Sequence, residues 1–404
     1  MKKFLLRGIG GIFILAIIRA SAAAIPPLNN AFVRYLGVAD EIAPAISGTI
    51  LALGYIFAVI GPLVAGRFTD TKGPTRTFLT GGLVFAVFFM LWTYAPVYQI
   101  LYLYRVILAL ASAAVFVGLQ AFLLEGAPEG KKGLGMGFYG LGFGVGAAIG
   151  PMLAFIVVPR FGIVQAYYVL AIASLAATII GFITVQIIKR FDKVDVVKET
   201  EPEQRKESFW KIIANQPLIV YLIVLAAIFV GINNAAVFAN VDDLGVSLGL
   251  EVGGGTAGVA IFALFSFAMP LGGGLGDRFG SARAMFIGIV LLTVGFGGLA
   301  FIGSASLIYP LMGLAGIGSI LFTPNSMSLI GSYAPIQLKG TLLSYLQGAV
   351  GLGSAVGATV GGMLHSYINV QATFMAVFIA GIVASIVAIF VMNKHKQKAP
   401  VAIS

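Results

Sequence analysis

The sequence predicts an all-α membrane protein with twelve transmembrane helices in two pseudo-symmetric six-helix bundles. Its 404 residues are 59% hydrophobic and 10% charged, whereas soluble domains carry roughly 25% charged residues. Apolar runs of about 20 residues, the length that a helix needs to cross the hydrocarbon core, recur along the whole chain. Two short polar loops, one in each half of the chain, match each other and indicate an internal duplication.

The first half supplies six of these runs, expected at 8–33, 44–65, 77–95, 99–124, 134–158 and 165–188. The first run follows Lys2, Lys3 and Arg7, as a secretory signal peptide would. We interpret it as a retained span, because it continues to about residue 33 and its removal would leave the two halves unequal. Turn signals every 8–12 residues, which a β-rich chain would need, are missing.

The second half repeats this order, with spans expected at 214–240, 255–276, 284–303, 307–332, 341–364 and 371–393. Segment 189–212 between the halves is the only long polar stretch, with seven basic and six acidic residues. We expect an N-terminal bundle at 1–188, a cytoplasmic linker at 189–212 and a C-terminal bundle at 213–404. A regulatory docking role for the linker is the alternative interpretation.

The duplication appears as nearly constant offsets between matching features. Asp70 and Asp277, in the two polar loops, are 207 positions apart. The run Gly146-Ala-Ala-Ile-Gly150 in the fifth span recurs as Gly357-Ala-Thr-Val-Gly361 in the eleventh, 211 positions later. Internal repeats of this kind are how many transporters build two matching halves.

Basic residues predict the orientation of the chain. With the N-terminus inside, 21 of the 25 Lys and Arg residues fall in cytoplasmic segments. The positive-inside rule therefore predicts a multi-pass plasma (inner) membrane protein with both termini in the cytoplasm. The net charge of +10 is accounted for by this topology and by anionic lipids, so nucleic acid is not an expected partner. Cysteine is absent, which excludes disulfides and thiolate metal sites.

Twelve spans, a long central loop and two Gly-x-x-x-Asp loops resemble the major facilitator superfamily over essentially the whole chain. The loops read Gly66-Arg-Phe-Thr-Asp70 and Gly273-Gly-Leu-Gly-Asp277-Arg278. The second loop fits the family pattern well, whereas the first has Thr71 where Arg is usual and a late Arg76. The resemblance implies alternating access by rocking of the two bundles around a central site.

The same loops supply the expected gate. Asp70 and Asp277 lie where one span ends and the next begins, so each carboxylate is expected to cap a helix start. The resemblance implies an added role for Asp70, Arg76, Asp277 and Arg278 in holding the cytoplasmic gate closed. Asp40 and Glu41, before the second span, are likewise expected to be cap charges.

Glycines at intervals of four line one face of the fifth and eleventh spans. Small residues at this spacing let helix backbones touch within a membrane. These positions are Gly142, Gly146 and Gly150, and Gly353, Gly357 and Gly361. The sequence Gly146-x-x-x-Gly150-Pro151 also resembles the antiporter motif of drug:proton exporters, although Ala154-Phe155 replaces its closing Gly-Gly.

Arg19 and Arg105 are the charged residues expected inside the membrane. A charge at mid-span costs at least about 2.5–3.5 kcal/mol and is tolerated mainly when it faces a cavity. None of the fifteen acidic residues is expected at mid-membrane. A bound anion is therefore the expected partner, since guanidinium pairs with carboxylate or phosphate through two parallel hydrogen bonds. The alternative for Arg105 is snorkelling outward or a structural bond to a carbonyl.

Several uncharged polar residues are secondary candidates for the substrate site. Prolines near some of them (Pro26, Pro27 and Pro324) are expected to break helices and expose carbonyl groups. The candidates are Asn29, Asn30, Asn233, Asn234, Asn325, Tyr345 and Gln347. Interhelical hydrogen bonding is the alternative for each one.

The sequence thus predicts a secondary transporter that exports or exchanges a small organic anion. One alternative is a proton-coupled exporter of lipophilic or cationic drugs, and another is a non-transporting sensor with a transporter fold. No nucleotide loop, metal cluster or nucleophile is recognisable, so no enzyme activity, cofactor or metal is expected. The expected partners are a small-molecule substrate, a counter-transported anion or proton, and membrane lipids, around a monomer.

Overall fold

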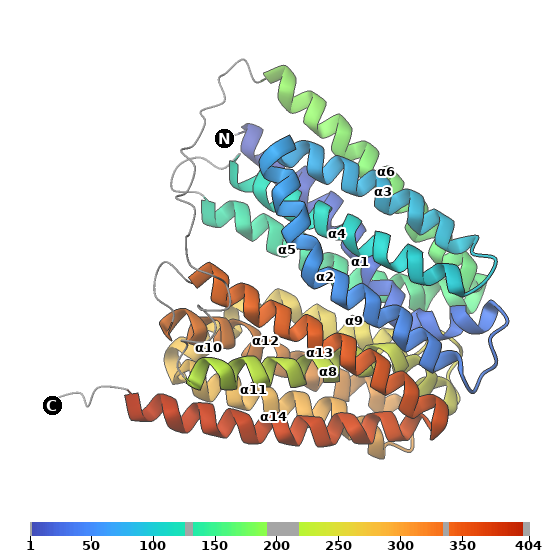
Figure 1. Cartoon of the computed structure of the whole chain (residues 1–404), viewed down its shortest axis with the longest axis vertical. Coiled ribbons are helices and arrows are strands. Elements are labelled where there is room, and N and C mark those ends of the chain that lie inside the picture. Colours follow the sequence, from blue (N-terminus) through green and yellow to red (C-terminus); the bar gives the residue numbers. More distant parts are fainter. Residues whose placement is uncertain (1, 126–131, 192–217, 334–338, 399–404) are drawn as a thin grey trace.

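The computed structural model of the chain describes residues 2–125, 132–191, 218–333 and 339–398, and every regular element within them is a helix. Figure 1 shows the helices running roughly side by side in two groups, with both termini toward one end. The first group comprises α1 (Lys2–Tyr35), α2 (Ala43–Lys72), α3 (Pro74–Thr93), α4 (Gln99–Glu125), α5 (Lys132–Phe161) and α6 (Ile163–Phe191).

The second group begins after the central segment, which lies outside the described residues from residue 192. It comprises α8 (Leu218–Ser247), α9 (Thr256–Leu264), α10 (Met269–Phe279), α11 (Ser281–Gly298), α12 (Ile308–Tyr333), α13 (Lys339–Tyr367) and α14 (Val370–Lys398). Three short 3₁₀ segments, at Phe265–Ala268, Leu299–Phe301 and Ala305–Leu307, adjoin these helices.

Length and hydropathy confirm that this is an all-helical membrane fold. Ten of the described helices are each long and apolar enough to cross a membrane. Six of them belong to the first group and four to the second, and the glycine-rich α13 and the interrupted α9–α10 stretch bring the second group to six as well. Large apolar side chains on the outside, such as Leu63 at 72% exposed and Ile172 at 57%, suit a surface solvated by lipid.

Buried apolar side chains form two separate cores. One draws on residues 14–188, with Ala235, Ala239 and Ala358 added from the second group, and the other draws only on residues 219–391. The two cores agree with the predicted duplication, because each group of helices buries its own apolar faces. The expected boundaries at 188 and 213 stay a prediction.

Glycine contacts explain how the helices of each group approach one another. On α5, Gly142, Gly146 and Gly150 lie against the α1 backbone at Ile12, Ala16 and Ala20. The matching glycines of α13 (Gly353, Gly357 and Gly361) lie against α8 at Ile228, Ile232 and Ala236. The same device therefore joins the first and fifth helices of each half.

Helix continuity differs from the expectation at the prolines. Pro26 and Pro27 lie within an unbroken α1, and Pro324 lies within α12, so the predicted breaks are wrong. The interruption falls instead at Phe265–Ala268, just before Pro270 in the first turn of α10. Pro270 has no N–H for the carbonyl four residues earlier, which favours the tighter 3₁₀ turn there.

Candidate functional site

Two arginines from different helices, Arg19 partly buried and Arg105 buried, come together in the first half. Arg19 lies on α1 and Arg105 on α4, close enough for their guanidinium groups to repel each other. Tyr55 of α2 lies within electrostatic reach of both groups. The candidates Arg19 and Arg105 therefore lie near each other, with Tyr55 close to both, and their role in substrate binding stays a prediction.

Aromatic side chains of α5 lie next to the Arg19 guanidinium group. Its Cζ atom lies 4.7 Å from the centre of the Phe143 ring, a favourable cation–π distance. Tyr139 stacks on Phe143 at 6.2 Å between ring centres and is within electrostatic reach of Arg19. Gly146 permits this arrangement, because a Cβ atom there would lie only 2.7 Å from the Cβ of Arg19.

Arg105 is held against the backbone of α2. It is 8% exposed, and a Cβ atom at Gly54 would overlap its guanidinium group. Tyr167 of α6 is a second aromatic neighbour. The missing side chain at Gly54 therefore makes the space that the guanidinium group occupies.

Neither arginine has an anionic partner among the described residues. The ionisable groups near Arg19 are Tyr55, Tyr139 and Arg105, and none is a carboxylate. The Nε atoms of Arg19 and Arg105 are buried and have no hydrogen-bond partner there. Two unneutralised guanidinium groups can bind a carboxylate, sulfonate or phosphate group by donating hydrogen bonds to its oxygens. In the described ranges no cluster of His, Asp or Glu could hold a metal ion.

The asparagines of α1 lie away from this site. Asn29 donates from Nδ2 to Ser47 Oγ on α2, at 2.8 Å, which ties two helices of one half. Asn30 crosses to the other half and donates to the Ala239 carbonyl of α8 at 2.9 Å. Both residues thus make interhelical bonds, the alternative that the sequence left open, and their substrate role stays a prediction.

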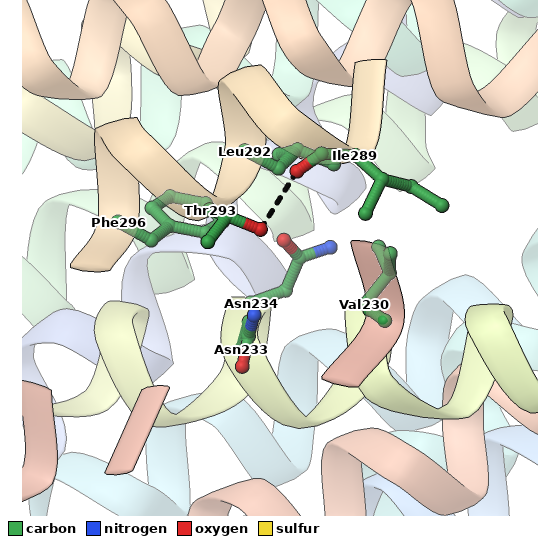
Figure 2. Close-up of a pocket in the computed structure, with 8 residues that line it drawn as sticks. Val230, Asn233, Asn234, Ile289, Leu292, Thr293 and Phe296 are labelled. Atoms are coloured by element: carbon green, nitrogen blue, oxygen red, sulfur yellow. Dashed lines mark hydrogen bonds between the residues drawn. The ribbon is translucent and has the colours of Figure 1, made fainter. Parts of the chain in front are cut away.

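The polar candidates of the second half are scattered. Figure 2 shows Asn234 pointing toward Thr293 of α11, with Asn233 directed away, around a pocket too narrow for a water molecule. Asn325 is buried and donates to the carbonyls of Gly272 and Leu321 at 3.0 and 2.8 Å. Gln347 is exposed on α13. The Tyr345 side chain lies outside the described residues.

The loop residues expected to form a gate are all exposed. Asp70 and Arg76 flank the α2–α3 turn, Asp277 and Arg278 end α10, and within the described ranges none of them makes an ion pair. The capping prediction is wrong, because α3 and α11 begin after Gly73 and Gly280 without a side-chain cap. These glycines have φ of 85° and 91°, which suits glycine and not a capping aspartate. The gating role stays a prediction.

Ion pairs join the two halves at the opposite end of the helices. Arg34 of α1 donates two hydrogen bonds to the Asp243 carboxylate of α8, at 2.5 and 3.2 Å, and also contacts Asp40 at 3.2 Å. Asp40 is thus an ion-pair partner and not a helix cap, and α2 has no side-chain cap. His365 Nδ1 lies 3.5 Å from Asp243 within the second half. Asp243 is 9% exposed, so water competes little for this pair.

Close backbone packing accompanies these ion pairs. The Ala45 amide of α2 donates to Ser366 Oγ of α13 at 2.9 Å, and Gly48 lies against the Ala358 carbonyl. Thr256 of α9 donates to the Pro151 carbonyl of α5 at 3.1 Å. We call this set of contacts the closed end. The sequence does not predict the closed end, although Arg34 and Asp243 follow the first spans of the two halves.

Two helical halves, a cationic interior and contacts that join the halves at one end define a secondary membrane transporter. The chain belongs to the Major Facilitator Superfamily, whose model matches residues 8–269 and 253–403. It is a multi-pass membrane protein that carries a small molecule and is not an enzyme. The resemblance inferred from the spans and loops is thereby confirmed.

Similar proteins include efflux pumps. The chain is 22% identical to the "Multi-drug resistance efflux pump PmrA homolog" of Lactococcus lactis subsp. lactis (strain IL1403), over 84% of this chain and 83% of that protein. It is also 22% identical to the "Multidrug resistance protein MdtG" of Dickeya zeae (strain Ech586), over 84% and 82%. Among solved structures, the POT family transporter PepTSo matches with a TM-score of 0.77 and 13% identity, over 97% of this chain and 99% of that one.

Proposed function

We propose that this transporter exports drug-like organic compounds and that its arginine site favours compounds with an acidic group. Export is supported by relatives that are named as multidrug efflux pumps. The preference for anions is supported by Arg19 and Arg105, which lie together without a carboxylate among their described neighbours. That pair is the observation on which the substrate class rests.

The aromatic residues around the arginines suggest that the substrate also has an apolar part. Phe143 and Tyr139 offer ring faces next to Arg19, and Tyr55 offers a ring and a hydroxyl group between the two arginines. An amphipathic acid can place its charged group on the guanidinium pair and its apolar body on these rings. Exchange against a second anion would use the same contacts.

Proton-coupled export of lipophilic or cationic compounds is the second candidate. It is favoured by the multidrug names of the relatives and by the Gly146-x-x-x-Gly150-Pro151 pattern, which resembles a drug:proton antiporter motif. A cationic substrate in the first half would meet two like charges without a described carboxylate to offset them. Because the two arginines would repel a cationic substrate, we rank this candidate function below anion export.

Binding of an aromatic acid and of its uncharged amide to purified protein tests this ranking. We expect Arg19→Gln to weaken acid binding by roughly thirty- to several-thousand-fold, the cost of truncating one partner of a desolvated charge pair (about 2–5 kcal/mol). Arg19→Lys should restore it only in part, because lysine lacks the planar pair of donors. Arg105→Gln should act in the same direction, and the amide should bind all variants alike.

Arg160→Gln is the matched control, because Arg160 is exposed at the end of α5 and distant in sequence from both site arginines. Tight acid binding by Arg19→Gln would contradict the anion site. Binding of a lipophilic cation that improves in the same variant would favour the second candidate.

The orientation of the chain in the membrane is part of the same proposal, with both termini in the cytoplasm. The concentration of Lys and Arg at the end that carries the termini supports cytoplasmic N- and C-termini. The closed end then faces outward, and the site is reached from the cytoplasm, as export requires. A monomer suffices, because both arginines and their aromatic neighbours belong to one chain.

A further inference from the structure

A groove on the first half is separate from the arginine site. It lies between α2 and α3 over α4 and holds about 340 Å³ of space, a volume at the lower end of the range of ligand pockets. Small residues such as Gly61 and Ala114 leave this space open, and Val64, Phe68, Thr80 and Val84 line it. Its lining is almost wholly apolar.

The groove faces away from the second half. Gly48 and Val59 of α2 contact α13, at Ala358 and Gly351. At 3.6 residues per turn, Val64 and Phe68 lie on the opposite side of α2 from these contacts. Val64 is 57% exposed, Phe68 40% and Val84 39%. An open apolar groove on this side of a membrane-spanning helix meets the acyl chains of lipids.

Two cations stand at one end of the groove. Lys72 lies one turn beyond Phe68 on the same face of α2, and Arg76 lies one turn before Thr80 on α3. Both side chains are exposed, and the turn at Gly73 brings their helices together. The Thr80 hydroxyl donates to the Arg76 carbonyl at 2.7 Å, so α3 is regular between the cation and the groove.

We propose that this groove binds an anionic phospholipid, with one acyl chain between α2 and α3 and the phosphate on Lys72 and Arg76. On α2 the lining of the groove runs from Gly61 to Phe68, about 10 Å at 1.5 Å per residue, which holds part of an acyl chain. The exposed cations follow at the end of the helices, where a headgroup meets the water. Juxtamembrane basic residues are attracted to anionic lipids, by about fivefold in affinity for each residue.

The duplicated half shows that the fold does not require this pair of cations. At the offset of 207 positions, Arg283 corresponds to Arg76, but Phe279 stands in place of Lys72. There Gly272, the counterpart of Ala65, lies directly against the Ile320 carbonyl, so α10 sits closely on α12. The second half has Arg278 one position before Phe279, so what is particular to the first half is the pairing of Lys72 and Arg76 with an open groove.

Native mass spectrometry of the full chain, with dioleoyl phosphatidylglycerol and dioleoyl phosphatidylcholine as probes, tests the proposal. These lipids have identical acyl chains and differ in headgroup charge. We expect phosphatidylglycerol to bind more tightly, and the double variant Lys72→Gln/Arg76→Gln to lose about 25-fold of that affinity. Phosphatidylcholine binding should not change. Soluble glycerol phosphate should not compete, because it has no chain for the groove.

Two further variants distinguish lipid binding in the groove from attraction of lipids to surface charge in general. Val64→Phe with Val84→Phe fills the groove from exposed positions and should weaken the binding of both lipids. Arg283→Gln, at the matching place in the second half, should leave both unchanged. Equal affinity for the two lipids, or full phosphatidylglycerol binding by the Lys72→Gln/Arg76→Gln protein, would overturn the proposal. Unfolding temperatures in phosphatidylcholine confirm that each variant is folded.

Discussion

Gly54 leaves the space that the Arg105 side chain occupies. The guanidinium group lies where a larger residue at 54 would put its Cβ atom, so an arginine on α4 can reach the backbone of α2. Charged groups inside a membrane persist where their surroundings fix them and where they serve a function. Gly54 thus fixes where the Arg105 guanidinium group can lie.

Replacing Gly54 by alanine should displace the Arg105 guanidinium without unfolding the protein, because the end of an arginine side chain can move. Losing a hydrogen bond to a charged group costs about 1.5–3 kcal/mol, so acid binding should fall roughly ten- to hundredfold. Isothermal titration with the aromatic acid measures this. Gly61→Ala is the control: its Cβ atom would meet Ala113 of the same helix α4 and no arginine. Unchanged binding in Gly54→Ala would remove Gly54 from the site.

Some of the site could be predicted residue by residue. Arg19 and Arg105 stand out in the sequence because an unpaired charge in an apolar span is costly. Tyr55 and Phe143 carry no such signal, since an aromatic residue in a membrane span is unremarkable in sequence. Asp70 and Asp277 are not caps, because Gly73 and Gly280 make those turns with positive φ and the helices that follow begin without a polar side-chain cap.

At the scale of helices, the glycine faces of α5 and α13 set how closely the first and fifth helices of each half approach. A Cβ atom at Gly150 would overlap the Ala20 carbonyl of α1, and backbone cannot yield as a side chain can. The four-residue spacing predicted these faces from the sequence. The partner helices could not be predicted, because spacing identifies a face and not what it contacts.

Two alanine substitutions on α5 should therefore differ in their effect on stability. Gly150→Ala should destabilise the protein by about 1–3 kcal/mol, as overpacking does. Gly140→Ala meets open space in the described part of the chain, and it should be neutral or stabilising by up to about 1 kcal/mol, because alanine favours helix more than glycine. Unfolding in mixed micelles measures both. A stabilised Gly150→Ala protein would show that the α1–α5 contact is looser than described.

For the molecule as a whole, the closed end determines which side of the interior is sealed. Arg34 and Asp243 join α1 to α8 while the exposed loops at Asp70 and Asp277 make no ion pair in the described ranges. Alternating access requires contacts that form in one state and break in another. The Arg34–Asp243 pair has the position and the burial of such a contact.

Removing this pair should shift the protein away from the state described here. Arg34→Gln should lower the population of the closed end about tenfold, the equivalent of one hydrogen bond to a charged group. The chain has no cysteine, so a pair introduced at Ala45 and Ser366, which touch across the halves, reports closure by cross-linking. The charge-swapped variant Arg34→Asp/Asp243→Arg should restore much of the cross-linking. Equal cross-linking in Arg34→Gln would make this ion pair incidental to closure.

The interrupted stretch from α9 to α10 makes the two halves mechanically unequal. Its counterpart α2 is one continuous helix from Ala43 to Lys72, whereas the second half has a four-residue 3₁₀ turn at Phe265–Ala268. Such a turn advances about 2.0 Å per residue and not 1.5 Å, with 3.0 residues per turn in place of 3.6. α10 is thus rotated by roughly a quarter turn from the phase of α9. The two halves of a duplicated chain therefore differ in the path of their second span: it is one helix in the first half and two helices out of phase in the second.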